Sequence, residues 1–265
     1  MRKITFIIIT ISVLFSCNSK TKNNEHGTKE SISKPDESKS FQKPTSKLLV
    51  SDIPTAEIPK SIEIKGSLLV AKKWKDNNGE NILILSRKGP LKETEFEVEF
   101  SGDEQYAEFY GEQYLKKDNE FKLLWDIYDF ERHCPFDLWI GNLPNSTQIT
   151  DLDDDGITET TITYKLTCRS DVSPSSMKVV IHENKTKMAL RGTMILDMDK
   201  SRMSNDFEYD LSKVDTTGLS EYERIIELYG RYSNENDFKN KPSEFLSFAK
   251  ETWKKFVGKD EFKQL

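Results

Sequence analysis

The sequence predicts an α+β fold, in which a mainly antiparallel β-sheet domain is followed by amphipathic C-terminal helices. The first observation is a series of apolar runs that are separated by turn residues and are rich in aromatic and β-branched side chains. The second is a change of hydrophobic period after residue 220, from the alternation of strands to the spacing of helices. The third is a stretch of 48 N-terminal residues that shows a targeting segment and a polar segment but no core pattern.

The N-terminus is typical of an exported protein. Two basic residues precede the apolar run Ile4–Phe15, which is short for a transmembrane helix. The run ends in Leu14-Phe15-Ser16-Cys17, which resembles a bacterial lipobox. The resemblance implies that residues 1–16 are a lipoprotein signal peptide and that Cys17 is lipidated, the alternative being an uncleaved membrane anchor. Asn18 after the cysteine resembles an outer-membrane signal, so we expect an outer-membrane lipoprotein of the cell envelope, with the leaflet left open.

Residues 17–48 read as the lipidated cysteine and a disordered linker, because they are rich in Lys, Ser, Asn, Thr and Glu and nearly free of apolar side chains. A flexible linker of this length spans about 30 Å on average. A single β-rich domain with C-terminal helices is predicted over residues 49–265. The net charge of −6 shows no excess of the basic side chains that bind phosphate groups, so nucleic acid is not an expected partner.

Three β-hairpins are predicted, each from two apolar runs around a polar turn. The turns are Asp76–Gly79, which contains the Asn-Gly pair favoured in tight hairpins, Lys116–Asn119 and Asn184–Lys187. The flanking strands are expected at Ser67–Trp74, Glu80–Ser86, Tyr106–Leu115, Phe121–Phe130, Met177–His182 and Met188–Leu196. A further half-buried strand is expected over Glu93–Phe100, where apolar residues alternate with glutamates.

Two helices follow. Ser220 and Glu223 form an S-x-x-E capping box before apolar residues at helical spacing. A last helix is expected to begin with Ser243 as its cap and to end with Gly258 as its C-cap. Its aromatic stripe predicts a face that packs in the core rather than a ligand site.

The densest acidic cluster, Asp151–Glu159, predicts a Ca²⁺ loop ahead of a strand. Its carboxylates alternate, and Gly156 permits a sharp turn that brings later ligands round the ion. The expected ligands are Asp151, Asp153, Asp155, the backbone carbonyl of Ile157, and Glu159. An EF-hand requires glutamate at its twelfth position, where this chain has Ile162, so the loop instead resembles the DxDxDG loops between strands of integrin-like and FG-GAP repeats. The alternative is a solvated acidic turn.

Cys134 and Cys168 are expected to form a disulfide, because paired cysteines are the usual state in an oxidising envelope. One alternative is a zinc site that also uses His133 and His182, although the spacing of a zinc motif is missing. Another is Cys–His catalysis by His133 and Cys134, which neighbouring residues on a strand disfavour since their side chains point to opposite faces.

Evidence for an enzyme is weak in this sequence. It contains no nucleophile elbow, phosphate-binding loop or HExxH motif, so we leave the question open and favour a non-enzymatic role. Arg169 and Asp171, in the turn after Cys168, are candidates to bind a sugar or a carboxylate, the alternative being that they pair locally and shape the turn.

The run from Ile149 to Gly192 resembles a family of Bacteroidota envelope lipoproteins known as surface polysaccharide biosynthesis proteins. The shared pattern is an acidic DLDxDG loop, a strand, a CRSDVSP turn and a lysine-containing strand, with looser similarity at Trp125-Asp126, Cys134–Asp137 and Phe245–Trp253. The resemblance implies a role in the biosynthesis or display of lipopolysaccharide or capsule. The implied partners are the membrane, through the lipid anchor, and polysaccharide or envelope assembly proteins. Alternatives are an envelope hydrolase or transferase acting on glycans, and an accessory subunit of an envelope complex.

Overall fold

A computed structural model describes residues 48–94, 103–170, 173–196, 201–204 and 206–261. Every described residue belongs to one compact unit. The predicted signal peptide, the lipidation site Cys17 and nearly all of the linker lie outside the described residues and stay predictions. No helix in the described part of the chain is long and apolar enough to cross a membrane.

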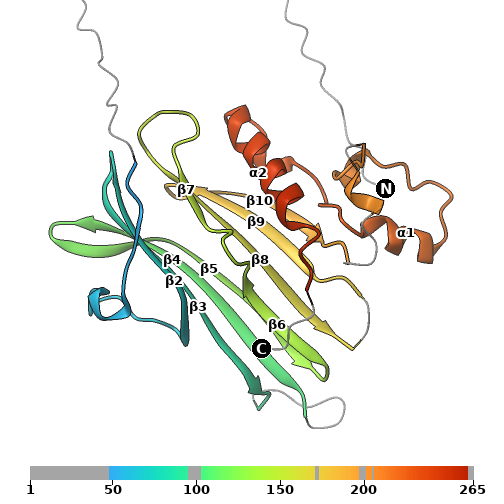
Figure 1. The fold of residues 1–265 in the computed structure, drawn as a ribbon, viewed down its shortest axis with the longest axis horizontal. Helices are drawn as coiled ribbons and strands as arrows, with labels where there is room; N and C mark the ends of the chain where they lie inside the picture. The colour runs from blue at the N-terminus through green and yellow to red at the C-terminus, as the bar shows by residue number, and fades with distance from the viewer. Residues whose placement is uncertain (1–47, 95–102, 171–172, 197–200, 205, 262–265) are drawn as a thin grey trace, which may run out of the picture. The chain divides into compact units, whose positions relative to one another are not determined.

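The first sheet contains five antiparallel strands in sequence order (Figure 1). They are β1 (Ser51–Asp52), β2 (Ser67–Asp76), β3 (Gly79–Lys92), β4 (Gln105–Lys117) and β5 (Glu120–Cys134). We call it sheet A. Its two tight hairpins form at the predicted turns, and Asp76 pairs with Gly79 across the first of them.

The second sheet, sheet B, has the order β10-β9-β8-β6, and β7 also pairs with β8. Its strands are β6 (Asp137–Asn142), β7 (Gln148–Thr150), β8 (Glu159–Arg169), β9 (Ser176–Glu183) and β10 (Thr186–Thr193). All its pairings are antiparallel, so the predicted mainly antiparallel fold is confirmed.

Sheets A and B pack face to face around a shared core. Phe109 of β4 stacks on Tyr164 of β8, with ring centroids 4.7 Å apart, and both side chains are buried. This core follows from the strand alternation, because residues at every second position of a strand point to the same face. Burial of these apolar side chains is the main force that holds the two sheets together.

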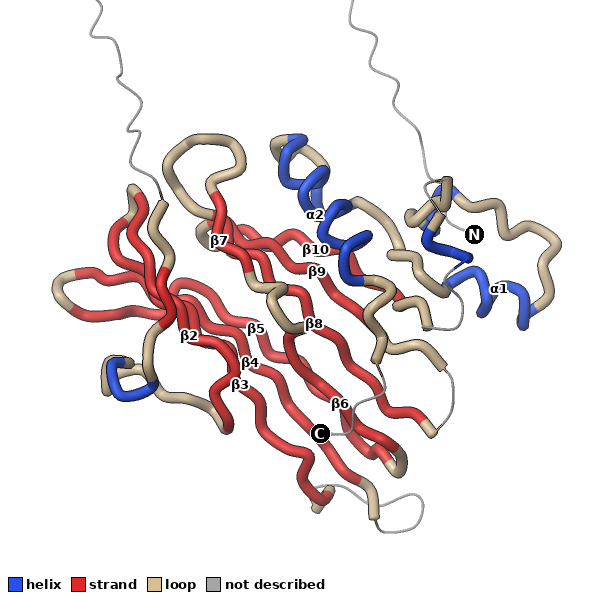
Figure 2. Tube along the Cα trace, in the orientation of Figure 1, coloured by secondary structure: helices blue, strands red, loops and turns tan. Residues whose placement is uncertain are grey.

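The other face of sheet B is covered by helix α2 (Ser243–Phe256), which lies across β9 and β10 (Figures 1 and 2). Its apolar stripe is core, as predicted: Trp253 is fully buried and donates its indole N–H to the carbonyl of Gly230 at 2.9 Å. Other helical elements in the described part of the chain include α1 (Glu221–Leu228) and the 3₁₀ turns η1 (Thr55–Glu57), η3 (Leu211–Lys213) and η4 (Asn236–Phe238). The α+β prediction with C-terminal helices therefore holds.

Helix ends were predicted with mixed success. The capping box of α1 is present, with the Ser220 side chain accepting from the Glu223 backbone and the Glu223 side chain accepting from the Ser220 backbone. At α2 the expected cap is wrong, because Pro242 occupies the N-cap position and Ser243 is already helical. The C-cap is Val257 rather than Gly258. Gly258 serves packing instead, since a Cβ there would overlap the sulfur of Met203.

Most of the predicted strand Glu93–Phe100 lies outside the described residues. Only Glu93 and Thr94 are described. Strand β3 runs on to Lys92, well beyond the predicted end at Ser86. Its backbone hydrogen bonding continues at Glu93, whose N–H donates to the carbonyl of Glu104 at 2.8 Å.

Candidate metal centre

The acidic loop lies between β7 and β8, as the sequence predicts. Asp154 and Gly156 take the left-handed conformation, with φ of 59° and 83°. Carboxylates of the loop then accept from its own backbone: the N–H of Gly156 donates to Asp151 at 3.2 Å, and that of Ile157 to Asp155 at 2.6 Å. These bonds hold the loop in a tight curve with its acidic side chains gathered.

Two groups of carboxylates in this region are close enough to share a cation. One contains Asp151, Asp153 and Glu159, and the other contains Asp153, Asp155 and Glu183; within each group the candidate ligand oxygens lie within 4.8 Å of one another. Asp155 therefore joins Glu183 rather than Glu159. The groups are made of side-chain oxygens alone, so the role predicted for the carbonyl of Ile157 stays a prediction.

Glu159 is the residue of these groups whose surroundings best fit a cation ligand. It is fully buried, and its Oε2 accepts from the N–H of Leu152 at 2.8 Å and from the hydroxyl of Thr150 at 3.2 Å. Its Oε1 and the Oδ1 of Asp151 are buried with no hydrogen-bond partner among the described residues. A buried carboxylate oxygen without a donor is costly, and a metal ion is one partner that removes the cost.

Electrostatics point the same way. Burial raises the pKa of Glu159 to about 7, although the bonds from Leu152 and Thr150 act in the opposite direction. Burial and the neighbouring Asp155 likewise raise the pKa of Asp153. Both shifts express the cost of keeping negative charge here without a compensating cation.

Glu183 was missed by sequence reasoning. It ends β9 and pairs directly with Glu159 across the β8–β9 ladder. Like charges directly opposite each other destabilise a sheet, and a cation held by either group would offset this repulsion. No local motif marks Glu183, because only the register of two strands brings it to the loop.

The loop also joins the two sheets. The N–H of Asn77, in the β2–β3 turn, donates to the carbonyl of Gly156 at 2.9 Å, and Asp76 accepts from the hydroxyl of Thr158 at 2.8 Å. That hydroxyl in turn accepts from the indole N–H of Trp74 at 2.7 Å. The shape of the acidic loop is therefore coupled to sheet A as well as to sheet B.

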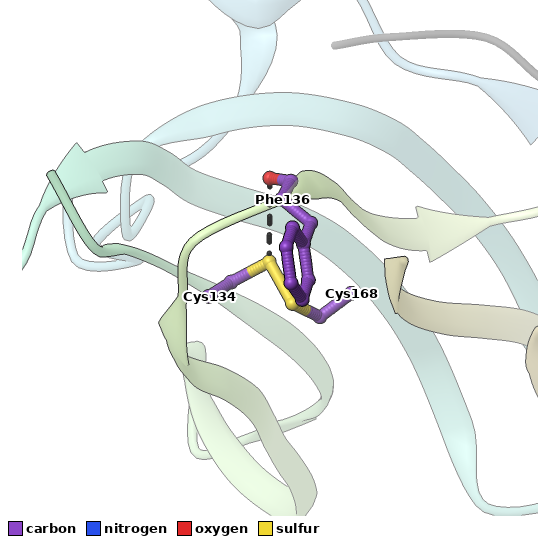
Figure 3. The surroundings of a disulfide bond; sticks show 3 residues. All are labelled: Cys134, Phe136 and Cys168. Carbon is purple, nitrogen blue, oxygen red and sulfur yellow. Dashed lines mark hydrogen bonds between the residues drawn. A yellow bond between two sulfur atoms is a disulfide. The ribbon is translucent and has the colours of Figure 1, made fainter. Parts of the chain in front are cut away.

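Cys134 and Cys168 form a disulfide between the end of β5 and β8, as predicted, with their Cα atoms 5.6 Å apart (Figure 3). The sulfur of Cys134 lies 3.4 Å from the carbonyl oxygen of Phe136, a contact without a donated hydrogen since a disulfide sulfur carries none. The bond removes both thiolates, so the zinc and Cys–His alternatives are wrong. His182 stacks on Trp125, with ring centroids 3.9 Å apart.

Arg169, a candidate to bind a sugar or a carboxylate, is not exposed to solvent, and its guanidinium group is bonded within the protein. It is buried and donates two hydrogen bonds, of 2.8 and 3.2 Å, to the carboxylate of Asp260, which follows α2. Lys165 and Ser175 also donate to Asp260, and Arg169 donates to the carbonyl of Ser173 in the turn. We call Lys165, Arg169, Ser175 and Asp260 the C-terminal clasp. Asp171 lies outside the described residues.

No family model, curated protein or solved structure matches this chain. The protein is therefore classified by its own fold and site. It consists of two packed antiparallel sheets with a helical layer, and its candidate cation site lies where turns of both sheets meet.

Proposed function

We propose that the acidic loop binds Ca²⁺ and that the bound ion stabilises the junction between sheets A and B. The observation that carries the proposal is the pair of buried, unpartnered oxygens on Asp151 and Glu159 within one group of carboxylates. Hard carboxylate oxygens are the ligands that Ca²⁺ prefers, and Ca²⁺ accepts the irregular geometry that a loop provides. Asp153 belongs to both carboxylate groups and would be a ligand in either arrangement.

Thermal unfolding with Ca²⁺ and with chelator tests this proposal. A ligand that binds only the native state at 100 times its Kd stabilises it by about 2.7 kcal/mol, so Ca²⁺ should raise the Tm of the wild type. Glu159→Gln and Asp153→Ala should lose most of this increase. Asp154→Asn is the matched control, since it removes a loop carboxylate that belongs to neither group and asparagine tolerates the left-handed conformation. Equal Ca²⁺ responses in wild type and Asp153→Ala, or none in the wild type, would contradict the proposal, because Asp153 belongs to both groups.

Glu183→Gln separates the two carboxylate groups. If the ion sits among Asp151, Asp153 and Glu159, this variant keeps most of the Ca²⁺ response, whereas an ion held by Asp153, Asp155 and Glu183 makes the response depend on it.

We further propose that the protein is an outer-membrane lipoprotein, attached through Cys17, that takes part in the biosynthesis or display of surface polysaccharide without catalysing a reaction itself. The support is the lipobox-like segment and the resemblance of residues 149–192 to envelope lipoproteins of that kind. A glycan-acting hydrolase or transferase and an accessory subunit of an envelope complex are the competing roles. The proposal assigns no catalytic residue.

A deletion strain tests this role through its surface-polysaccharide profile. Loss of the long-chain ladder, restored by the wild-type gene and not by a Cys17→Ala gene, is the expected result. An unchanged ladder in the deletion strain would remove the polysaccharide role. Full restoration by Cys17→Ala would show that lipid attachment is not needed.

A further inference from the structure

Strand β4 presents a regular pattern to the face of sheet A that points away from sheet B. Ala107 and Phe109 belong to the core between the sheets. The alternate positions therefore lie on the opposite face, where tyrosines and glutamates follow one another at Tyr106, Glu108, Tyr110, Glu112 and Tyr114. The segment that carries Ile53, Ile58 and Ile62 packs against part of this face, around Tyr114.

The remaining part of the face carries exposed aromatic rings. Tyr128 and Phe130 of β5 lie on it, because they pair with Tyr110 and Glu108 of β4, and each is 49 % exposed. The ring centroids of Tyr128 and Phe130 are 5.6 Å apart, and those of Tyr110 and Tyr128 are 5.3 Å apart. We call Tyr110, Tyr128 and Phe130, with Glu108 and Arg132, the sheet A platform.

Polar side chains are fixed among these rings. Glu108 is buried and accepts hydrogen bonds from the hydroxyls of Tyr110 and Tyr128, at 2.8 and 3.0 Å, and from Arg132 at 2.9 Å. Burial by itself would raise the pKa of Glu108, but the bonds from Tyr110 and Tyr128 and the nearby Lys88 lower it, so the carboxylate is charged at neutral pH. The platform is thus held in one arrangement before any ligand arrives, which reduces the entropy cost of binding.

The charges of the platform balance locally. Arg132 lies within ion-pair distance of Glu93 and Glu108, and Lys88 within 3.4 Å of Glu108. Lys65, which lies 5.1 Å from the ring centroid of Tyr110, pairs with Glu112 at 2.7 Å, so among these side chains three cations face three carboxylates. A strongly charged ligand of either sign would find no matching excess of charge among the described side chains around the platform. A cationic ligand is further disfavoured because cations of the protein already lie near two platform rings, Lys65 at 5.1 Å from the centroid of Tyr110 and Arg132 at 5.9 Å from that of Phe130.

We propose that the sheet A platform binds an uncharged glycan, whose sugar rings stack on Tyr128 and Phe130 while its hydroxyl groups bond with the surrounding polar side chains. The C–H faces of a sugar carry partial positive charge, which complements the negative faces of aromatic rings. Sugar hydroxyls both donate and accept, which suits a surface where carboxylate, guanidinium and phenol groups lie side by side. An entirely apolar partner would cover Arg132, which is still partly exposed, without replacing the water that it binds.

This inference deepens the proposed polysaccharide role and rests on it. Its test is biolayer interferometry of the full chain, purified in detergent, against immobilised dextran, mannan and galactomannan, with polygalacturonate as the charged comparison. We expect binding to at least one neutral polysaccharide, weakened about tenfold in Tyr128→Ala and in Phe130→Ala. Tyr222→Ala on α1 is the matched control, since Tyr222 is an exposed aromatic residue outside sheet A and its loss should leave binding unchanged.

Several outcomes would overturn the platform: no binding to any neutral polysaccharide, stronger binding to polygalacturonate, or unchanged binding in a Tyr128→Ala/Phe130→Ala double variant that keeps the Tm of the wild type. The deletion strain separates this inference from the proposed role. If deletion removes the long-chain polysaccharide ladder and the gene for the double variant restores it fully, the proposed glycan binding by the platform is wrong and the polysaccharide role stands. An unchanged ladder together with glycan binding by the wild type overturns the polysaccharide role alone.

Discussion

Asp260→Ala should lower the free energy of unfolding by about 3–5 kcal/mol, the cost of removing one partner from a buried ion cluster. Asp260 is 1 % exposed and accepts from Lys165, Arg169 and Ser175, so its loss leaves two cations buried without their carboxylate. Urea unfolding monitored by circular dichroism measures the effect. Because Arg169 lies on β8 and Asp260 follows α2, the variant should also loosen the end of the chain, visible as faster amide exchange there.

The control for this prediction is Asp237→Ala. Asp237 also accepts from an arginine, Arg191, at 2.8 Å, but both side chains are partly exposed. Surface ion pairs contribute about 0–1 kcal/mol, so this variant should unfold nearly as the wild type does. Similar losses in the two aspartate variants would contradict the structural role that we give to the C-terminal clasp.

The clasp also predicts a pH dependence. Burial would raise the pKa of Asp260, but the bonds from Arg169 and Ser175 and the charge of Lys165 outweigh it and lower the pKa below that of the unfolded chain. The contribution of Asp260 is therefore present at neutral pH and is lost as the pH falls through its native pKa. Acid should narrow the difference in stability between wild type and Asp260→Ala.

Removal of the disulfide should have an effect of nearly the same size. Cys134 and Cys168 are 34 residues apart, and closing a loop of that length in the unfolded chain stabilises the fold by about 3–4 kcal/mol in the loop-entropy model. The double variant Cys134→Ala/Cys168→Ala should lose this amount in urea unfolding. Alanine avoids placing a new polar group at Cys134, which is fully buried.

Reduction supplies the control for the disulfide. A reductant should destabilise the wild type and leave the double variant unchanged, because only the wild type has a bond to break. If the purified wild type showed two free thiols by mass spectrometry, or if the double variant were as stable as the oxidised wild type, the predicted contribution would be wrong.

Interactions that span a few residues were predictable from the sequence. The hairpin turn at Asp76–Gly79 depends on residues that favour a tight turn, and the capping box of α1 joins Ser220 to a residue three positions away. The acidic loop was recognisable because alternate carboxylates and Gly156 lie within nine residues. Even the aromatic pattern of β4 is visible in the alternation from Tyr106 to Tyr114, although its partners on β5 are not.

The tertiary structure decided which of these local features meet. Glu183 reaches the acidic loop only through the register of β8 and β9, and Arg169 meets Asp260 across 91 residues of chain. Alternation assigns each side chain to a face of its strand, but it does not say which sheet covers that face or what lies at its margin. Those contacts depend on the packing of the whole domain, because the burial that stabilises one pairing is gained only when every layer is in place. The sequence alone thus determined the class of fold, the disulfide and most of the acidic loop, while the second acidic group, the C-terminal clasp and the sheet A platform came from the packing.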